Sequence, residues 1–282
     1  MDFPWQFRTV QANDLEFHCA HMGEGPLVLL LHGFPECWYS WRHQIPALAR
    51  HFRVVAPDLR GYNLSSKPRE VSAYLLDYLV EDVMALARAW GESHFYLVGH
   101  DWGAAIAWAA ALRHPYRVSK VAALQVPPLL AWRENLTPQQ LLASFYILLF
   151  QIPGLAEYRL SADDYRMIRS IFTHPSVRPG KINPEDIQYF VDAIKRGSLT
   201  AMLHYYRANV MRGFAPDLLA RIQVPSLFIY GEDDFAITPE LVYRLDRYVL
   251  SDYQELRIPE CGHWSQQEYP ELVNETLLKF LL

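Results

Sequence analysis

Short runs of aliphatic and β-branched residues recur along the chain and predict the strands of a sheet. Some runs, such as Leu27–Leu31, are apolar at every position, which is typical of a strand buried on both faces. The first two runs are joined by the short turn Ala12-Asn13-Asp14, so we expect them to pair antiparallel. The predicted strands are Arg8–Gln11, Leu15–Ala20, Leu27–Leu31, Arg53–Ala56, Phe95–Val98, Lys120–Leu124, Ser226–Tyr230 and Glu255–Ile258.

Helical patterns lie between several of these strands. Strands that alternate with helices predict an α/β fold, with a mostly parallel eight-stranded sheet covered by helices on both faces. Across residues 128–213, prolines punctuate helical stretches and no strand is indicated, so we expect an inserted helical lid, or cap. Residues 1–127 and 214–282 would form the core domain, whose predicted helices are Trp38–Ala49, Ala73–Trp90, Gly103–Arg113, Pro239–Val249 and Glu271–Leu281.

Composition narrows the classes of partner. A chain of 282 residues, 51% of them hydrophobic, is long enough to bury one substantial core. The net charge of −5 argues against nucleic acid or an anionic membrane and favours small-molecule partners. We expect a monomer or a homodimer. The first residues lack the pattern of a signal peptide and no apolar run could span a bilayer, so we expect a cytoplasmic protein. Three cysteines without CxxC spacing predict buried or idle thiols and no metal cage.

The segment around Asp101 has the strand-turn-helix pattern of a nucleophile elbow. The predicted strand Phe95–Val98 runs into Gly99-His100-Asp101-Trp102-Gly103, and a helix follows. In such an elbow, flanking glycines let strand and helix approach while a tight turn exposes the central side chain. Aspartate is also a common helix N-cap, but a glycine on each flank favours the catalytic interpretation. Asp101 stands where most such elbows carry serine.

A carboxylate nucleophile changes the reaction that the elbow can perform. It initiates amide or ester cleavage poorly, yet it can displace a leaving group at saturated carbon and then carries an ester itself. Water must hydrolyse that ester, which requires a histidine base and an oxyanion hole. His263 follows the last predicted strand and suits the base. An acid that orients it is expected at Glu232, Asp233 or Asp234, which gives the chain order nucleophile, acid, histidine.

Two backbone N–H groups are candidates for the oxyanion hole. One belongs to Trp102, directly after the nucleophile, and the other to Phe34, in the His32-Gly33-Phe34-Pro35 loop that follows an early strand. Pro35 would fix the turn of this loop, with a cis bond as one way to do so.

Four motifs taken in order resemble the epoxide hydrolase branch of the α/β-hydrolase fold family, over essentially the whole chain. They are His32-Gly33-Phe34-Pro35-Glu36, Trp41-Arg42, Asp58-Leu59-Arg60-Gly61-Tyr62 and Gly99-His100-Asp101-Trp102-Gly103. The resemblance implies that epoxides are hydrolysed to vicinal diols without a metal or an organic cofactor.

The resemblance also implies a role for individual residues. It implies that Asp101 is the nucleophile, that His263 is the base and that Asp234 is the acid. It further implies that two lid tyrosines, Tyr146 and Tyr206, bind the epoxide oxygen, with Tyr205 as the alternative to Tyr206. Apolar side chains suggest a pocket for aryl or alkyl epoxides, and the residues expected at the substrate are Phe34, Pro35, Trp38, Trp102 and Leu149, with Phe145, Leu148 and Ile152 in the lid.

Two other functions compete with epoxide hydrolysis. Haloalkane and haloacid dehalogenases share the aspartate elbow, but a fluoride-releasing relative is expected to carry arginine where Trp102 and Ala105 stand. A haloalkane-type relative would more often carry glutamine and asparagine in place of His100 and Phe34. A non-catalytic ligand-binding module of the same fold would usually keep the serine form of the site.

Overall fold

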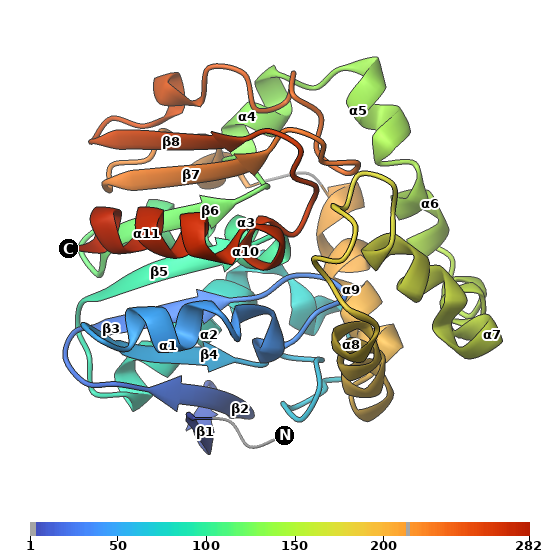
Figure 1. The fold of residues 1–282 in the computed structure, drawn as a ribbon, viewed down its shortest axis with the longest axis horizontal. Helices are drawn as coiled ribbons and strands as arrows, with labels where there is room; N and C mark the ends of the chain where they lie inside the picture. The colour runs from blue at the N-terminus through green and yellow to red at the C-terminus, as the bar shows by residue number, and fades with distance from the viewer. Residues whose placement is uncertain (1–3, 213–214) are drawn as a thin grey trace.

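Eight strands form a single sheet, as the apolar runs predict (Figure 1). The structure, a computed structural model, describes residues 4–212 and 215–282. The order of strands across the sheet is β1-β2-β4-β3-β5-β6-β7-β8. The strands are β1 Gln6–Ala12, β2 Leu15–Met22, β3 Leu27–Leu31, β4 Arg53–Pro57, β5 Phe95–His100, β6 Val118–Leu124, β7 Ser226–Gly231 and β8 Tyr253–Ile258.

The sheet is parallel except at its N-terminal edge. Strand β2 runs antiparallel to both β1 and β4, and the other neighbouring strands pair parallel. The β1–β2 turn places Asn13 and Asp14 at φ 50° and 59°, the positive values that suit a tight hairpin with right-handed twist. The predicted mostly parallel α/β sheet with an antiparallel first pair is confirmed.

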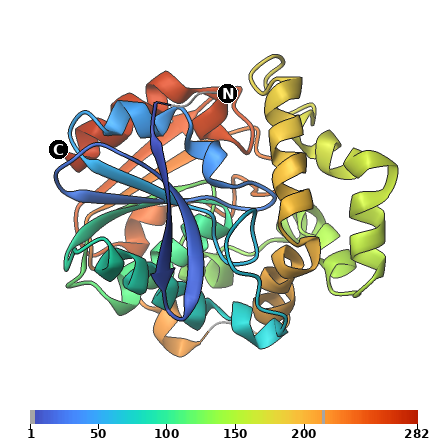
Figure 2. The same cartoon turned by 90° about the horizontal axis from the view of Figure 1, so that it is seen from below.

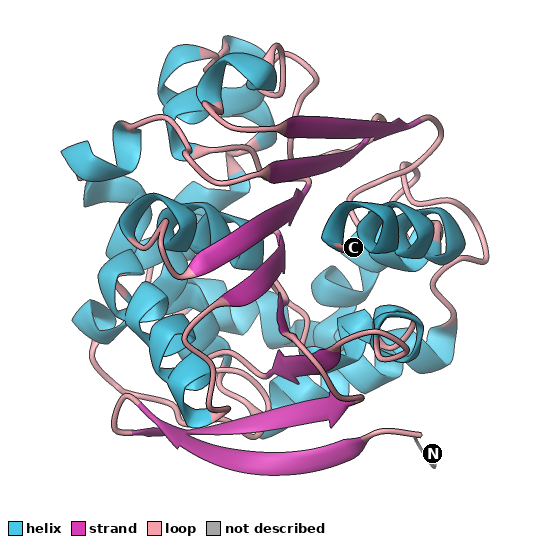
Figure 3. Cartoon of the chain, turned by 90° about the vertical axis from the view of Figure 1, so that its left-hand side faces the viewer, coloured by secondary structure: helices cyan, strands magenta, loops and turns pink. Residues whose placement is uncertain are grey.

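Helices cover both faces of the sheet (Figure 3). On one face α1 packs against α11, and on the other α2 packs against α3, which also contacts β5 and β6. Alanines dominate α3, so it lies close behind the strand that leads to Asp101. The bounds are α1 Gln44–Leu48, α2 Leu76–Ala89, α3 Trp102–Arg113, α10 Ser265–Glu268 and α11 Pro270–Leu281, with 3₁₀ helices η1 Trp38–Trp41, η2 Val71–Tyr74, η3 Val210–Arg212, η4 Pro216–Leu219 and η5 Leu245–Tyr248.

Two predicted helices differ from the structure. The segment Pro239–Val249 is not an α-helix but a series of turns that ends in η5, because Arg244 adopts left-handed backbone angles (φ 52°) that interrupt a helical repeat. The segment Trp38–Ala49 is divided into η1 and α1. Pro46 has no N–H to bond the carbonyl of Arg42, so one continuous helix through this segment would lack a bond.

The cap is a group of helices at the carboxyl ends of the parallel strands (Figures 1 and 2). No helix among the described residues is long and apolar enough to cross a membrane. All three cysteines are buried and unpaired, as predicted. The cap helices are α4 Leu129–Glu134, α5 Pro138–Ala143, α6 Tyr146–Phe150, α7 Leu155–Phe172, interrupted by non-helical residues at 162–165, α8 Pro184–Arg196 and α9 Leu199–Asn209.

Polar bonds fix both ends of α8 to the core domain. At its start, Asp186 accepts hydrogen bonds from Arg42 Nη2 and from the hydroxyl of Tyr39, both at 2.9 Å. At its end, Arg196 Nε donates to Asn63 Oδ1, also at 2.9 Å. Because Arg42 and Asp186 are largely removed from water, the bond between them helps to define where the cap lies over the sheet.

Candidate active site

Asp101 lies at a sharp turn between β5 and α3, with φ 52° and ψ −118°. The glycines on either side of it are required by close packing. A Cβ on Gly99 would lie 2.1 Å from the carbonyl oxygen of Gly103, and one on Gly103 would lie 2.0 Å from that of Leu31. Strand and helix therefore approach as closely as the elbow requires, and the turn stores backbone strain at Asp101.

The loop after β3 holds one oxygen of the Asp101 carboxylate. The backbone N–H of Phe34 donates to Asp101 Oδ1 at 2.8 Å, and the Phe34–Pro35 peptide is cis. Gly33 has no room for a side chain, since its Cβ would lie 2.3 Å from that of Asp101. Trp102 begins α3, so its N–H belongs to the first turn, whose N–H groups have no carbonyl partner within the helix.

His263 is oriented by one of the three acids that follow β7. Its Nδ1 donates to Asp234 Oδ2 at 2.8 Å, while its Nε2 lies 3.7 Å from Asp101 Oδ2. The second Asp234 oxygen accepts N–H groups two and three residues further on, which fixes the carboxylate. Glu232 and Asp233 are exposed. The structure therefore brings Asp234, and neither neighbour, to the imidazole.

Asp101 and Asp234 lie close enough to His263 for their charges to shift its pKa, and the charge of His263 in turn shifts the pKa of Asp101. Burial alone would lower the pKa of His263, but the negative charges of Asp234 and Asp101 outweigh it, so its pKa is well above the usual value. Burial would likewise raise the pKa of Asp101, yet the imidazolium of His263, together with His100 and the Phe34 N–H, lowers it. These shifts favour an ionised Asp101 carboxylate beside a protonated imidazole in the free protein.

Replacing Asp101 with asparagine should lower the pKa of His263 from its wild-type value. Asparagine keeps the shape of the side chain but removes one of the two negative charges that favour the imidazolium. The imidazole of Asp101→Asn should lose its proton at a lower pH than the wild type in a ¹⁵N NMR titration. The control is Asp233→Asn, which removes an exposed carboxylate of the same loop. An unchanged titration in Asp101→Asn would contradict the charge coupling.

Two cap tyrosines complete the surroundings of Asp101. Tyr206 is buried, and its ring lies edge-on to Phe34 and to Trp102, with centroids 5.6 and 5.2 Å away. Burial and the charge of Asp101 raise the pKa of Tyr146 and of Tyr206, while a hydrogen bond with Tyr206 opposes the rise at Tyr146. Both phenols therefore stay protonated at neutral pH and are able to donate hydrogen bonds.

Tyr205 has a different partner from its neighbour. Its hydroxyl donates to the backbone carbonyl of Arg60 at 2.9 Å, and the side chain is fully buried. The hydrogen atom of this phenol is thus used in fixing α9 to the core domain. Of the two adjacent tyrosines, Tyr206 is the one whose pKa responds to the charge of Asp101.

The side chains of α6 do not point in the directions expected for helix residues that line an apolar pocket. Phe145, Leu148 and Ile152 are exposed to solvent, so the prediction that they line a pocket is wrong. The inner face of the helix instead presents Tyr146 and the buried Phe150, whose ring lies 4.9 Å from that of Tyr206. Residues three and four apart share a helix face, and this short helix turns its other side outward.

Two other predicted substrate residues occupy packing positions. Leu149 is half-buried against the core. Trp38 is fully buried, and its indole packs edge-on against Trp5, Phe7 and Tyr189. Trp38 therefore packs between the N-terminal strands and α8 and has no exposed surface. The prediction that it contacts the substrate is corrected accordingly.

A buried pair of side chains, Glu36 and His100, lies next to the backbone of His263. Sequence reasoning missed the pair, although both residues lie within the quoted motifs. His100 Nδ1 bonds Glu36 Oε2 at 2.8 Å, and His100 Nε2 donates to the backbone carbonyl of His263 at 2.8 Å. Glu36 also accepts bonds from Ser40 and Gln267. The pair thus supports the loop that carries the base. Two polar residues beside a nucleophile and an oxyanion loop were the signal that could have indicated it.

Removing the charge of Glu36 should destabilise the fold strongly. Burial alone would raise its pKa, but facing His100 and Ser40 lowers it, so the buried carboxylate is ionised. Glu36→Gln leaves His100 without its counter-charge and should lower the free energy of unfolding by about 3 kcal/mol. A depressed pKa contributes stability that is lost as pH falls through it, so the variant's deficit should shrink in acid. Urea denaturation tests both, with exposed Glu24→Gln as the control; equal stability would contradict the role.

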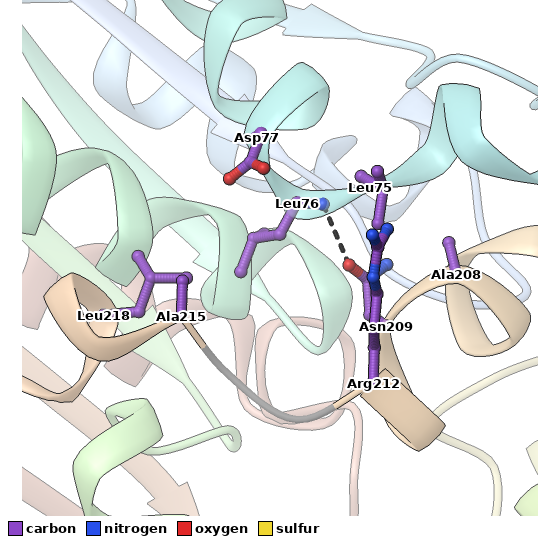
Figure 4. Close-up of a pocket in the computed structure, with 8 residues that line it drawn as sticks. All are labelled: Leu75, Leu76, Asp77, Ala208, Asn209, Arg212, Ala215 and Leu218. Carbon is purple, nitrogen blue, oxygen red and sulfur yellow. Dashed lines mark hydrogen bonds between the residues drawn. The ribbon is translucent and has the colours of Figure 1, made fainter.

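A separate cavity of about 340 Å³ lies where the cap returns to the core domain (Figure 4). Its walls include Leu75, Arg212 and Leu218, and Asn209 crosses it to accept a hydrogen bond from the backbone N–H of Leu76 at 2.9 Å. None of its lining residues is a candidate for the chemistry at Asp101. We assign it to the junction between cap and core.

Comparison with known proteins agrees with this fold. Residues 26–270 match the model of the alpha/beta hydrolase fold. The chain therefore belongs to the α/β-hydrolase fold family.

Within that family the chain is similar to epoxide hydrolases, as predicted. It is 36% identical to Epoxide hydrolase 3 of Mus musculus, over 96% of this chain and 75% of the relative. It is 37% identical to Epoxide hydrolase A of Mycobacterium tuberculosis, over 97% of this chain and 96% of the relative. The crystal structure of the Bacillus megaterium epoxide hydrolase in complex with an inhibitor matches with a TM-score of 0.89 at 32% identity, covering 97% and 99% of the two chains.

Proposed function

We propose that this protein hydrolyses apolar epoxides to vicinal diols through a covalent ester on Asp101. The observation that carries the proposal is the arrangement around the carboxylate. One oxygen is held by the Phe34 N–H and the other lies beside His263. The phenols of the buried Tyr206 and the half-buried Tyr146 have pKa values that the charge of Asp101 raises. The epoxide hydrolase relatives support the same reaction.

In the first step, Asp101 Oδ2 attacks one epoxide carbon and the bond from that carbon to the ring oxygen breaks. Oδ2 is assigned as the attacking atom because Oδ1 already accepts the Phe34 N–H. The alkoxide that develops on the ring oxygen receives hydrogen bonds and a proton from Tyr146 and Tyr206. Such donors contribute because phenols with raised pKa values are neutral in the free protein yet face a strongly basic alkoxide in the transition state.

In the second step, His263 removes a proton from water, and the water oxygen attacks the ester carbonyl carbon of Asp101. Ester formation has by then removed the negative charge of Asp101, one of the two charges that raise the pKa of His263. Losing that charge lowers the pKa of His263, so the imidazolium can release its proton to the phenolate left by ring opening. The neutral imidazole, still oriented by Asp234, can then accept a proton from water. The N–H groups of Phe34 and Trp102 stabilise the oxyanion at Oδ1. When it collapses, the bond from the Asp101 carbonyl carbon to the diol oxygen breaks, and the imidazolium of His263 gives its proton to that oxygen as the diol leaves.

The substrate class follows from the side chains around the carboxylate. Phe34, Trp102 and Phe150 surround the tyrosine pair with aromatic surface, and none of them carries a charge. A charged substituent would lose its hydration against this surface without gaining a partner. We therefore propose aryl or alkyl epoxides as substrates.

A single turnover in H₂¹⁸O tests the ester mechanism. With enzyme in excess over styrene oxide, the diol should contain no ¹⁸O, because its new oxygen comes from the Asp101 carboxylate. The peptide that contains Asp101 should gain the mass of one ¹⁸O-for-¹⁶O exchange. Label in the first-turnover diol would mean direct attack by water on the epoxide. Halide release from a bromoalkane without any diol from styrene oxide would identify a dehalogenase instead.

A further inference from the structure

The loop that carries His263 is bonded through both its carbonyl groups and its N–H groups. The carbonyl oxygen of His263 accepts a hydrogen bond from His100 Nε2 at 2.8 Å. The residues before and after His263 donate their backbone N–H groups to the carboxylate of Glu268, Gly262 to Oε2 at 3.1 Å and Trp264 to Oε1 at 3.2 Å. One side chain therefore binds the backbone on both flanks of the base.

The carboxylate of Glu268 also binds the cap. The oxygen that accepts the Gly262 N–H accepts the backbone N–H of Arg178 as well, at 2.9 Å. Arg178 lies in the loop between α7 and α8, and this loop passes so close that a Cβ on Gly262 would lie 2.7 Å from the carbonyl oxygen of Ser176. The position of the base loop is therefore tied to the cap as well as to the core domain.

A helix cap does not account for Glu268. The side chain is fully buried, and a buried carboxylate is costly unless its oxygens accept hydrogen bonds. The bond to Trp264 alone would be an ordinary cap, because Trp264 is the residue before α10. The other two donors, Gly262 and Arg178, lie outside α10 and a cap does not require them. The carboxylate thus joins three segments, which are the base loop, α10 and the cap.

We propose that Glu268 is a positioning residue for hydrolysis of the ester, the second step of the proposed function on which this inference rests. A general base must hold its nitrogen within hydrogen-bond reach of the water that it deprotonates. Asp234 orients the imidazole of His263, whereas Glu268 fixes the backbone from which the imidazole projects. Ring opening depends instead on Asp101 and the two cap tyrosines, so a displacement of this loop affects the second step more than the first.

Glu268→Gln tests the proposal, because the side chain only accepts hydrogen bonds. Oε1 accepts from Trp264, while Oε2 accepts from Gly262 and Arg178. An amide replaces one of these oxygens with an NH₂ group, which cannot accept a hydrogen bond. Whichever way the amide turns, the backbone on one flank of His263 loses its partner.

A single turnover with enzyme in excess over styrene oxide separates the two rates. Intact-protein mass spectrometry of acid-quenched samples follows the ester. In Glu268→Gln the ester should form within a few-fold of the wild-type rate but decay about 10–100-fold more slowly, since a misplacement of about 1 Å can cost about 10²-fold. The control is Glu275→Gln, the same change at an exposed position of α11, which should leave both rates unchanged. A purely structural role would reduce the amount of ester that forms without changing its rate of decay.

Glu268→Asp gives a second test that keeps both acceptor oxygens. Its side chain is one methylene shorter, so the bonds to the three N–H groups should weaken, but no donor is placed against them. The ester should therefore decay at a rate between those of the wild type and Glu268→Gln. This variant decides the question if Glu268→Gln does not fold.

Failure of this inference is distinct from failure of the proposed function. Ester that decays at the wild-type rate in the folded Glu268 variants would overturn the positioning role and leave the ester mechanism standing. Ring opening and ester decay slowed equally would also overturn it, because the effect would then be a general disturbance of the site. If no ester forms even in His263→Gln, the proposed function is wrong and the role of Glu268 in hydrolysis falls with it.

Discussion

The reaction of His263→Gln should stop at the ester that we propose on Asp101. Asp101 and the two tyrosines remain in place, so the epoxide still opens, but no base activates water near the ester. Multiple turnover should fall by about 10²–10⁴-fold, the usual contribution of a positioned general base. Intact-protein mass spectrometry should show a gain equal to the whole epoxide, because ring opening expels no leaving group.

The double variant Asp101→Asn, His263→Gln is the matched control for that result. Its amide is a far weaker nucleophile than the carboxylate, so no adduct should form with the same epoxide. An adduct that persists in the control would place the ester on another residue. A His263→Gln protein that gains mass only from a haloalkane, less the acid lost, would indicate a dehalogenase. If neither compound leaves an adduct, Asp101 is not the nucleophile.

Replacing both Tyr146 and Tyr206 with phenylalanine should slow ring opening by about 10²–10⁴-fold, the range expected for proton donors to a developing alkoxide. The rings remain, so packing against Phe34 and Trp102 is largely retained. The loss should appear in the first step, measured as the rate of adduct formation in the His263→Gln background. Near-normal adduct formation without both hydroxyls would contradict the assignment of the pair.

Tyr205→Phe is the control that the chain itself offers for this prediction. It removes one hydroxyl from the residue beside Tyr206, but that hydroxyl bonds the carbonyl of Arg60. Adduct formation should therefore stay within a few-fold of the wild-type rate. The free energy of unfolding should fall by about 1 kcal/mol, because a buried carbonyl loses its hydrogen bond. A Tyr205→Phe protein that loses ring opening as severely as the pair would mean that the register of the two tyrosines is wrong.

Local sequence was sufficient for the framework of the sheet. Each run that predicts a strand corresponds to one of the eight strands. The signal is strongest for inner strands such as β3 and β7, because burial on both faces requires apolar residues at successive positions. The elbow could also be predicted, because contacts within a few residues and with the adjacent strand leave room only for glycine on either side of Asp101. The structure of Pro239–Val249 could not be predicted in this way. Its apolar spacing fits a helix, but Arg244 adopts left-handed backbone angles that interrupt one.

Only the tertiary structure could select among side chains whose environment comes from distant segments. Sequence pattern left Glu232, Asp233 and Asp234 open, and the position of His263 after a different strand decides which of them it meets. The outward phase of Phe145 and the pairing of Glu36 with His100 depend in the same way on what lies opposite them.

The chain by itself therefore determined its α/β class, its elbow and the kind of chemistry that a carboxylate there permits. Those features follow from local burial and backbone sterics, which neighbouring residues specify. Which acid orients His263, which tyrosine lies near Asp101 and which cap residues face solvent were decided by the fold. These are contacts between residues far apart in sequence, and spacing along the chain does not fix the distance between residues on different elements.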